Sequence, residues 1–496
     1  MVNSVKYFNE VCIKKFLEFE DKFIEKPTDI ASYVINVKET LEELGVKIIQ
    51  EALEELDQLI KNSSARKEKW SVERNTQKTL VTSVGTVNFK KTYYTNKESG
   101  EITCLLDRIM GIGDHKRITE DAVANILKEA VQTSYRRGGE NVSIGKTEVS
   151  KQTVKNVLHK LTFPEADVPK AKKVVDYLYI DADEDHVALQ FNDVRGDLES
   201  YEGRYKNNGF IAKLAYVYEG IEKEAPHSKR HRLVNPHYFC STSAYETNEE
   251  FWDDVYGYIE SHYDVSKIKK IFLNADGGTW IKGCKSRIAG ITYVLDEFHM
   301  EKYLVKMTSH MERYFSKEDV KEFRKTINEI IKDNTKEEFR NAIDFLQEYA
   351  VDDKEKEKIA DAGEYFLANW TAAKNRFADR KHVKGCSAEG HVSHVLSSRM
   401  SSRPMGWSKL GATQMGKLRV YYLNGGDMLE LARYQESSMP KAAGAEEEII
   451  LSAAEIIRNT KNRNGMIGKY FDTMPKCEIP TTVRKRFTIQ HHIAGL

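Results

Sequence analysis

The 496-residue sequence has few cysteines, and no two of them are spaced as in a zinc ribbon; the six are Cys12, Cys104, Cys240, Cys284, Cys386 and Cys477. Their scatter also argues against a disulfide framework, so reduced and mostly structural thiols are expected. No window approaches the roughly 20 apolar residues of a membrane-spanning helix. The N-terminus is charged throughout and has no signal-peptide core. We therefore expect a cytoplasmic protein.

An excess of charge of one sign is also missing, because 76 Lys and Arg balance 76 Asp and Glu. Taken alone, this neutrality weakly disfavours a nucleic-acid partner, since nucleic-acid-binding proteins tend to be basic. The charges are segregated, however: ten cations and two acids lie between Lys374 and Arg419, and eight cations and two acids between Arg458 and Arg486. Each segment can present a positive face to phosphate, or can simply be a set of solvated helix faces.

The length predicts more than one domain, and pattern divides the chain into six segments. These are an N-terminal helical region (1–75), a region that contains a possible helix-turn-helix and is therefore a candidate for DNA binding (76–165), a first α/β part (170–301), a helical insertion (302–380), a last α/β part (381–430) and a basic C-terminal region (431–496).

The segment 76–165 contains the candidate DNA-reading elements. Alternation around Gly85 predicts a hairpin, and a helix is expected from Thr119 as N-cap to Gly138–Gly139. "SIGKTEVSKQTVKNVLHKL" then predicts a short helix, a turn and a second helix that starts near Ser150. A helix-turn-helix has this spacing, although many ordinary helical pairs share it.

The segment "YLYIDADEDHVALQ" (177–190) is typical of a buried strand but carries acids in its middle. Side chains alternate between the faces of a strand, so Asp181, Asp183 and Asp185 share one face while Ala182 and Glu184 take the other. Three like charges on a half-buried face repel one another and are costly to desolvate. A divalent cation is the simplest compensating group.

Two further acids extend this candidate metal site. Asp276 closes the apolar strand "IFLNAD" and precedes Gly277 and Gly278, which permit a close backbone approach. Acids at strand ends of an α/β sheet lie where ligands usually bind. Glu389 is one of only two acids in the basic segment 374–419, near the start of a predicted helix. A surface glutamate paired with arginine is the alternative explanation for Glu389.

Four motifs in order along the chain resemble a bacterial insertion-sequence transposase: "LYIDADEDHVALQ", "NADGGTWIKG", "VLDEFHMEKYL" and "CSAEGHVSHVLSSRMSSRPMGWS". The similarity covers roughly residues 80–425 and is to the Lre-type family, a distant relative of the Mutator-like transposases. It implies an α/β fold with a ribonuclease-H-like (retroviral-integrase-like) catalytic core that an all-helical insertion interrupts. A mostly helical N-terminal DNA-binding region would precede that core.

The resemblance implies a DDE transposase whose catalytic acids are Asp183, Asp276 and Glu389. The same three residues would hold two Mg²⁺ (or Mn²⁺) ions for in-line displacement at phosphorus. The family's recurring element, Ala-Asp followed by Glu or Gly, matches residues 182–184 and favours Asp183 as the first acid. Asp181 is the alternative first acid.

Accessory residues follow from the same resemblance. Mutator-like relatives carry a Cys-or-Asp, two residues, His element after the second acid, and Asp296 and His299 fit it. His299 is expected near the active site, where it would contact DNA or stabilise the second strand. A buried histidine whose hydrogen bonds are all made within the protein is an equally good explanation. Trp407 could stack on an unpaired base near the transposon end, but core packing is the commoner role.

The expected partner is double-stranded DNA, both of the transposon ends and of the target, and no membrane is expected. The DNA backbone would be held by five cations: Arg376, Lys381, Lys384, Arg399 and Arg403. Because two DNA ends must be brought together, we expect a homodimer or a higher homo-oligomer, associated with the bacterial nucleoid.

Three rival functions have different chemistry. A glycosidase also places two carboxylates on a sheet, but it usually has an aromatic-rich sugar cleft, whereas the third acid here lies among cations. A ribonuclease-H-like nuclease would cut DNA without joining it. A transposase-derived protein could bind DNA without catalysis.

Overall fold

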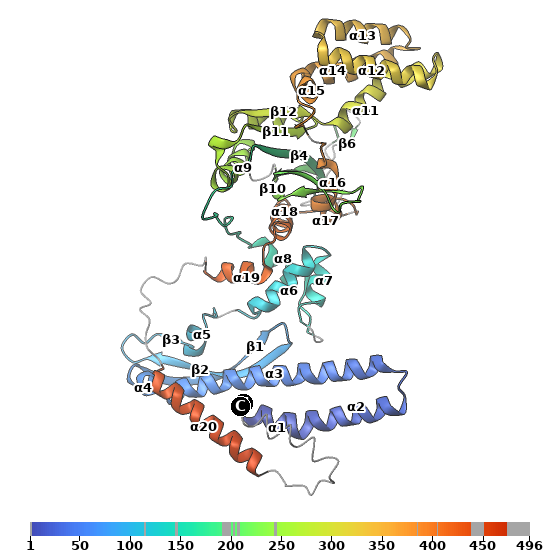
Figure 1. Cartoon of the computed structure of the whole chain (residues 1–496). Coiled ribbons are helices and arrows are strands. Elements are labelled where there is room, and N and C mark those ends of the chain that lie inside the picture. Colours follow the sequence, from blue (N-terminus) through green and yellow to red (C-terminus); the bar gives the residue numbers. More distant parts are fainter. Residues whose placement is uncertain are drawn as a thin grey trace. The chain divides into compact units, whose positions relative to one another are not determined.

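The computed structural model describes residues 2–113, 116–143, 147–190, 200–201, 204–205, 209–242, 246–383, 385–403, 405–437 and 451–473. They form two compact units (Figure 1). Unit 1 consists of the described residues of 1–125, 140–149 and 439–496, and unit 2 of those of 126–139 and 150–438. None of the helices in the described ranges is both long and apolar enough to cross a membrane.

Unit 1 opens with the helices that the apolar spacing predicts: α1 (Val2–Tyr7), α2 (Ile13–Glu25) and α3 (Ile30–Asn62). Helices α2 and α3 form an antiparallel hairpin, which Phe23 and Tyr33 close by stacking with ring centroids 5.1 Å apart. The predicted β-hairpin around Gly85 is confirmed as β1 (Trp70–Val81) and β2 (Thr86–Asn96), followed by the short β3 (Ile102–Thr103). The apolar side of this sheet packs on the second half of α3.

The remaining helices of unit 1 are α4 (Ser64–Lys69), α5 (Leu105–Ile109) and α20 (Ala453–Asp472). Helix α20 docks on the junction of α3 and α4, where Glu455 accepts a 2.9 Å hydrogen bond from the backbone N–H of Ser64. Helix α5 brings the buried Asp107 to two lysines of the sheet, Lys78 (3.1 Å) and Lys91. A paired acid of this kind is a structural element of the sheet.

Three short helices follow the hairpin along the chain and precede the large sheet: α6 (Glu120–Ala130), α7 (Tyr135–Glu140) and α8 (Lys151–His159). The prediction of one helix ending at Gly138–Gly139 is wrong, because α6 ends at Ala130 and Gly138 lies inside α7. A Cβ on Gly138 would be 3.3 Å from Ala130 Cβ and 3.4 Å from Val154 Cγ1. This glycine therefore permits close helix packing and is not a helix end.

The candidate helix-turn-helix is found only in part. Ser150 caps α8, as expected, by accepting a hydrogen bond from Thr153 N–H (3.2 Å). The short helix predicted before it is absent from residues 147–149, and residues 144–146 lie outside the described ranges.

A five-stranded mixed sheet forms the centre of unit 2, in the order β10-β7-β4-β11-β12. Its strands are β4 (Tyr177–Ala188), β7 (Gly209–Tyr218), β10 (His237–Thr242), β11 (Lys270–Ala275) and β12 (Ile291–Leu295). Strands β4, β7 and β10 pair antiparallel, whereas β11 is parallel to both β4 and β12. The predicted α/β class is confirmed as this mixed sheet with its many helices.

The segment 231–242 forms two strands, β9 (His231–Val234) and β10. The break falls at Asn235, whose φ of +49° is left-handed, and at Pro236, which lacks the N–H that a ladder requires. Strand β9 pairs instead with β8 (Gly220–Lys223) outside the main sheet.

The predicted alternation on β4 is confirmed. Ala182 joins the apolar core under α9 (Asn248–His262), and Glu184 accepts a 2.5 Å hydrogen bond from Trp280 Nε1 on the same side. Asp181 and Asp185 face the opposite side, where they contact Ser387 and Ser401.

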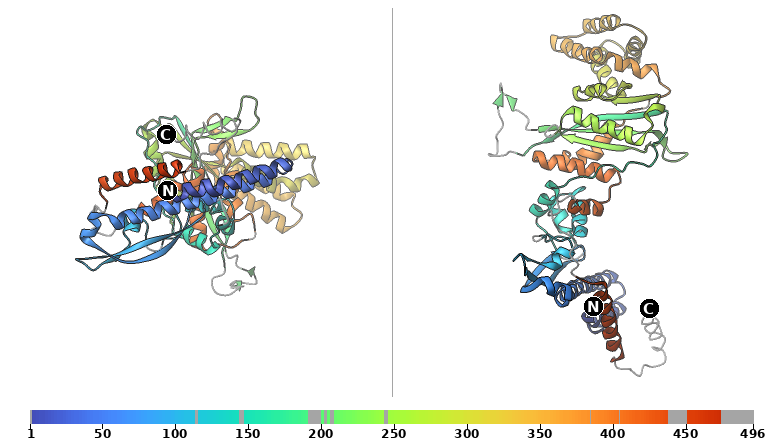
Figure 2. Two further views of the ribbon diagram at one scale, coloured as in Figure 1. Left: turned by 90° about the horizontal axis from the view of Figure 1, so that it is seen from below. Right: turned by 90° about the vertical axis from the view of Figure 1, so that its left-hand side faces the viewer.

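The helical pattern predicted over 302–380 is also confirmed, as α11 (Glu297–Thr308), α12 (Lys317–Asp333), α13 (Lys336–Glu348), α14 (Asp353–Ala368) and α15 (Trp370–Ala378). Ser316 begins α12 in a reciprocal capping box with Asp319. This helical block lies beyond the β12 edge of the sheet (Figure 2), and α15 returns the chain to that edge.

The chain then crosses the Asp181 face of the sheet in four helices and one π turn. They are α16 (Ala388–Val392), the π turn Ser393–Ser397, α17 (Ser398–Met400), α18 (Lys409–Leu423) and α19 (Met428–Ser437). Helix α16 packs on β4 and α18 on β10. Glu389, the third expected acid, is thereby carried to the strand that bears Asp183.

Candidate active site

Asp183 and Asp276 occupy matching positions on adjacent parallel strands. The ladder of β4 and β11 pairs Asp181 with Asn274, so Asp183 and Asp276 each lie two residues further along on the same face. Strand β11 ends at Ala275, which places Asp276 at its carboxyl end. Ligands usually bind at such strand ends in α/β sheets.

The Asp183 carboxyl lies in an environment that disfavours its charge. Burial raises its pKa to about 6, although the backbone N–H of Glu184 opposes the shift by donating a 2.8 Å hydrogen bond. The nearby charge of Asp276 raises this pKa further, while His299 lowers it. The two carboxylates therefore interact, and neither is matched by a salt-bridge partner of its own among the described residues.

The turn after Asp276 is held by the helical block. The Asp276 carboxylate accepts a hydrogen bond from Gly278 N–H (2.9 Å). The backbone carbonyl of Asp276 accepts a second one from the Tyr365 hydroxyl of α14 (2.6 Å). Gly277 has φ +105°, and a Cβ there would be 2.8 Å from Asn369 Nδ2. The glycine is therefore required both by the backbone conformation and by the close approach of the helical block.

Asp296 and His299 lie beside this pair, at the start of α11. Asp296 is the N-cap of the helix and contacts His299 Nδ1 at 2.9 Å. Burial would raise the pKa of Asp296, but the hydrogen bonds from His299 outweigh it and lower that pKa. The same bond raises the pKa of His299 against its burial, and the charges of Asp296, Asp276 and Asp183 raise it further. An imidazolium is thus favoured next to the two acids.

Asp181 is fully buried and saturated with hydrogen bonds. Its Oδ2 accepts from the Tyr216 hydroxyl (2.8 Å) and from Ser387 N–H (3.0 Å). Its Oδ1 accepts from the Tyr218 hydroxyl (3.0 Å) and from Asn274 Nδ2 (2.8 Å). With four donors around it, this carboxylate has no position left for a metal ion or substrate in the present arrangement. It ties β4, β7 and β11 to the residue that precedes α16.

Glu389 lies in the first turn of α16 and is exposed to solvent. No contact described in this structure joins it to Asp183 or Asp276. Within the described ranges, no three acidic, histidine or cysteine side chains are grouped closely enough to hold a metal ion. The structure thus brings together Asp183, Asp276 and His299, and leaves Glu389 on the adjacent helix outside that group.

Trp407 lies in the core. It is 6 % exposed, its Nε1 donates to the Met400 carbonyl (2.9 Å), and its ring meets Tyr135 edge-on at 6.0 Å. Arg399 lies over the same indole at 4.9 Å. The Trp407 ring has no exposed face for a DNA base.

The five cations expected to hold DNA differ in exposure. Arg376 and Arg399 are buried, the first against Glu297 and the second with its Nε donating to the Ala130 carbonyl (3.0 Å). Lys381 and Arg403 are exposed, and Lys384 lies outside the described residues.

Sequence reasoning missed the residues that surround Asp181. Asn274 stands two positions before Asp276 and shares its face, which is a usable signal from strand periodicity. Tyr216 and Tyr218 likewise alternate on β7, but their partner is set by the ladder with β4, which no local pattern reveals. Ser387 approaches Asp181 only through the fold.

Comparison with known proteins gives a family without a described activity. The family model described as "Uncharacterised protein family (UPF0236)" matches residues 26–437. One UPF0236 protein of Caldanaerobacter subterraneus subsp. tengcongensis is 37% identical over 432 residues, which are 86% of this chain and 86% of the relative. Another from the same organism is 38% identical over 414 residues, 83% of this chain and 82% of the relative.

A more distant relative is the UPF0236 protein in the vanSb 3' region of Streptococcus gallolyticus, 23% identical over 376 residues, 72% of this chain and 76% of the relative. Among solved structures, the Drosophila P element transposase strand transfer complex matches 70% of this chain and 86% of that chain, at 11% identity and a TM-score of 0.22. A TM-score this low supports no conclusion about the fold. The family match and the curated relatives establish that this chain belongs to the uncharacterised protein family UPF0236.

Proposed function

We propose that this chain is a DNA transposase that binds the terminal inverted repeats of an insertion sequence and cleaves and joins DNA by a metal-dependent DDE mechanism. The observation that carries the proposal is the proximity of Asp183 and Asp276: the β4–β11 ladder pairs Asp181 with Asn274, two residues before each acid, and the charge of Asp276 acts on Asp183. The raised pKa of Asp183 supports it, because perturbed carboxyl groups in pairs are characteristic of functional sites.

The donor set at this pair fits a hard divalent cation. Both side chains offer carboxylate oxygens, and their mutual repulsion is relieved when a cation binds between them. Mg²⁺ is commonly held by one or two protein carboxylates together with phosphate oxygens of the substrate. Asp183 and Asp276 would hold the metal, with Glu389 as the proposed third ligand. When bound, the ions would supply Lewis-acid stabilisation of the phosphate and of the leaving 3′ oxygen.

The chain's own residues have separate tasks in this proposal. Asp181 positions β4 against the start of α16, and the helical block fixes the Asp276 turn through Tyr365 and Asn369. His299, favoured as a cation, would contact a DNA phosphate next to the acids. The exposed Lys381 and Arg403 would contact the DNA backbone, which gives affinity without sequence information.

The architecture also supports a ribonuclease-H-like core. Three antiparallel strands are extended by two parallel ones. The first acid lies on the central strand β4, and the second directly follows the adjacent strand β11. A helical block separates the last strand from the helix with the third acid. These are the features that the resemblance to insertion-sequence transposases implies.

The names of two relatives support a mobile gene. One name joins eleven locus designations of a single genome, and another places the protein in the 3' region of vanSb. A coding sequence repeated at many positions of one genome is what a self-mobilising DNA element produces.

The test uses the purified full chain and a labelled duplex that carries one end of the DNA element encoding it. We expect strand cleavage in Mg²⁺ or Mn²⁺ that is lost in Asp183→Asn, Asp276→Asn and Glu389→Gln, while all three variants still bind the duplex. Asp344→Asn, which changes an exposed acid of α13, is the matched control and should cleave normally. Cleavage by Asp276→Asn at the wild-type rate would refute the assignment.

The exposed position of Glu389, away from the other two acids, favours one second candidate: a transposase-derived protein that binds DNA without catalysis. The same assay separates the two functions. Specific binding with no cleavage in either metal, over a range of pH, identifies the second candidate. A strand-transfer assay with precleaved ends then distinguishes a transposase from a nuclease.

A further inference from the structure

Helix α3 carries an apolar stripe that the described part of the structure leaves largely exposed. The stripe advances by alternating steps of four and three residues: Ile30, Val34, Val37, Leu41, Leu44 and Ile48. This is the heptad spacing of a helix seam that packs against another helix. Four of its members, Ile30, Val34, Leu41 and Ile48, are between 39 % and 55 % exposed. A soluble chain rarely leaves a row of this kind in water.

Helix α2 extends this apolar surface. Phe23 faces α3, and the exposed Leu17 and Ile24 lie about a third of a turn away from it around α2. On α3, the stripe lies at a similar angle from Tyr33. Because the two helices are antiparallel, both offsets turn toward the same side of the hairpin. Leu17 and Ile24 together with the α3 stripe form a two-helix surface, called the hairpin face below.

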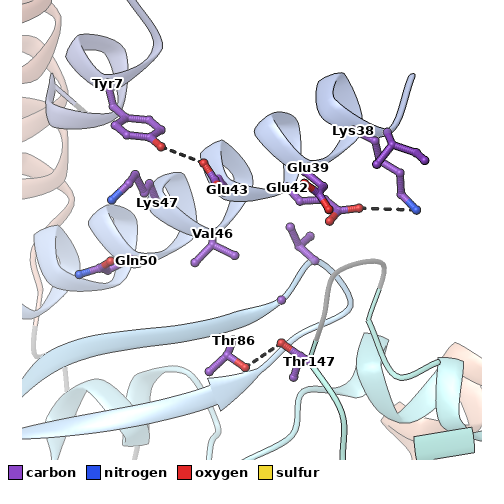
Figure 3. A pocket seen from close by; sticks show the side chains of 13 residues that line it. Tyr7, Lys38, Glu39, Glu42, Glu43, Val46, Lys47, Gln50, Thr86 and Thr147 are labelled. Atoms are coloured by element: carbon purple, nitrogen blue, oxygen red, sulfur yellow. Dashed lines mark hydrogen bonds and ion pairs between the residues drawn. The ribbon is translucent and has the colours of Figure 1, made fainter. Parts of the chain in front are cut away.

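The adjoining sides of α3 differ sharply in polarity. A cavity of about 770 Å³ on one side is lined mostly by polar and charged residues; there the Tyr7 hydroxyl donates a hydrogen bond to Glu43 (3.1 Å), and the exposed Lys38 lies 3.7 Å from Glu42 at its rim (Figure 3). The next groove, of about 600 Å³, is lined mostly by apolar side chains: Tyr33, Val34, Val37, Leu41 and Val84, with Lys38 and Glu42 at its border. The hairpin face therefore contains an apolar groove in which another helix can pack.

We propose that a second copy of this chain covers the hairpin face, forming a four-helix dimer contact. The face is self-complementary in charge. Phe23 lies opposite Tyr33, and Lys15 lies opposite Glu43. Because the helices are antiparallel, Glu20 of α2 and Lys38 of α3 therefore lie at nearly the same height, that is, the same position along the helix axes. A two-fold axis parallel to the helices places Lys38 against the partner's Glu20. It also places Leu41 against the partner's Leu17.

Closed two-fold symmetry is the commonest arrangement of soluble oligomers, and it uses the same surface on both subunits. A face with one acid and one base at equal height is suited to this arrangement, because the dimer contact then contains two opposite-charge pairs, each made of Lys38 of one copy and Glu20 of the other. This dimer contact does not depend on the proposed transposase activity.

The test is sedimentation of the full chain without DNA over a micromolar concentration series. We expect a wild-type dimer and, for Leu41→Glu, a dissociation constant raised about 100-fold or more, because a charge replaces an apolar side chain twice in each contact. Ile102→Glu is the matched control: Ile102 is equally exposed, at 51 %, but lies on β3 away from the face. Helix content by circular dichroism should be unchanged in both variants.

A charge exchange tests whether the occupant is a second copy. Lys38→Glu should weaken the dimer about tenfold by placing two acids together, and adding Glu20→Lys should restore it. A monomeric wild-type chain, an undisturbed Leu41→Glu dimer, or failure of the double variant to regain the wild-type dissociation constant would each overturn the proposal.

Discussion

The carboxylate of Asp181 accepts a hydrogen bond from the backbone N–H of Ser387 at 3.0 Å, although the two residues are 206 positions apart in the chain. This bond explains why an acid can lie in the middle of a buried strand. Its charge is surrounded by four donors from β7, β11 and the segment before α16, so Asp181 connects the sheet to the helix that carries Glu389. The neighbouring Asp183 accepts a hydrogen bond from Glu184 N–H and is the acid proposed above to act in catalysis.

Removing the Asp181 carboxylate should destabilise unit 2 strongly. In Asp181→Ala, Ser387 N–H, Asn274 Nδ2 and two tyrosine hydroxyls lose their acceptor in a buried site. An unpaired buried donor costs about 1–3 kcal/mol, so we expect a loss of about 3–5 kcal/mol in the free energy of unfolding. Urea unfolding followed by tryptophan fluorescence measures it.

Asp181→Asn should cost much less, about 1 kcal/mol, because Asn274 Oδ1 is buried without a partner and can turn to accept from the new amide. As a comparison, Asp185→Asn should also be mild, since its partner, the Ser401 hydroxyl, can rotate to donate or accept. Equal losses for Asp181→Ala and Asp185→Asn would contradict the assigned role of Asp181.

Divalent cations should stabilise the free protein through Asp183 and Asp276, even without DNA. A ligand at 100 times its dissociation constant adds about 2.7 kcal/mol to the free energy of unfolding. We expect Mn²⁺ or Mg²⁺ to raise the melting temperature of the wild-type chain and of Asp344→Asn, and excess chelator to reverse the rise. Asp183→Asn and Asp276→Asn should show little of this effect. An equal rise in all four proteins would place the ion elsewhere.

Of the two arginines in the last α/β segment, truncation of Arg399 should destabilise the protein, whereas truncation of Arg403 should leave its stability nearly unchanged. Arg399 is buried over Trp407 and donates to the Ala130 carbonyl, and burial lowers its pKa only to about 10, so it stays charged. Arg399→Ala should therefore cost about 2–4 kcal/mol of stability. Arg403 is exposed, so Arg403→Ala should change stability by about 0.5 kcal/mol or less.

DNA binding should show the reverse order. If Arg403 contacts a phosphate, Arg403→Ala weakens binding and reduces the slope of log affinity against log salt by about 1. Arg399→Lys is the informative companion, because it keeps the charge but loses the planar contact with the indole. A stable Arg399→Ala protein with a reduced salt slope would reverse these assignments.

Local pattern predicted the parts of this fold that depend on neighbours in sequence. Strand periodicity placed Asp181, Asp183 and Asp185 on one face, and the pattern around Ser150 placed the start of α8. The helical block was readable because its apolar positions repeat at three and four residues. In each case the deciding interaction lies within one element or at its end.

The parts that could not be predicted depend on distant segments. Gly138 looks like a helix end by composition, but the close approach of Ala130 and Val154 decides its place. Asp181 and Asp183 look alike in sequence, and what distinguishes them is the set of four donors that the fold brings to Asp181: Tyr216, Tyr218, Asn274 and Ser387. Arg399 looks like a surface cation until helix packing buries it. Charge density along a sequence does not tell which cations reach solvent.

The docking of α20 on unit 1 should depend on pH through Glu455. Hydrogen bonds from Ser64 N–H and from the backbone and hydroxyl of Ser452 lower the pKa of Glu455 from 4.5 to about 2. Because the folded pKa lies below the unfolded one, the carboxylate's contribution is complete above pH 4.5 and is lost as the pH falls toward 2. Hydrogen exchange at Ser64 N–H should therefore become less protected over this range.

Glu455→Gln should show the weaker protection already at pH 6 and lose the pH dependence. Glu10→Gln, at the other end of α20, leaves an oxygen that Tyr470 can still bond and should behave as wild type. Equal pH profiles for the wild type and Glu455→Gln would mean that this carboxylate does not hold the helix.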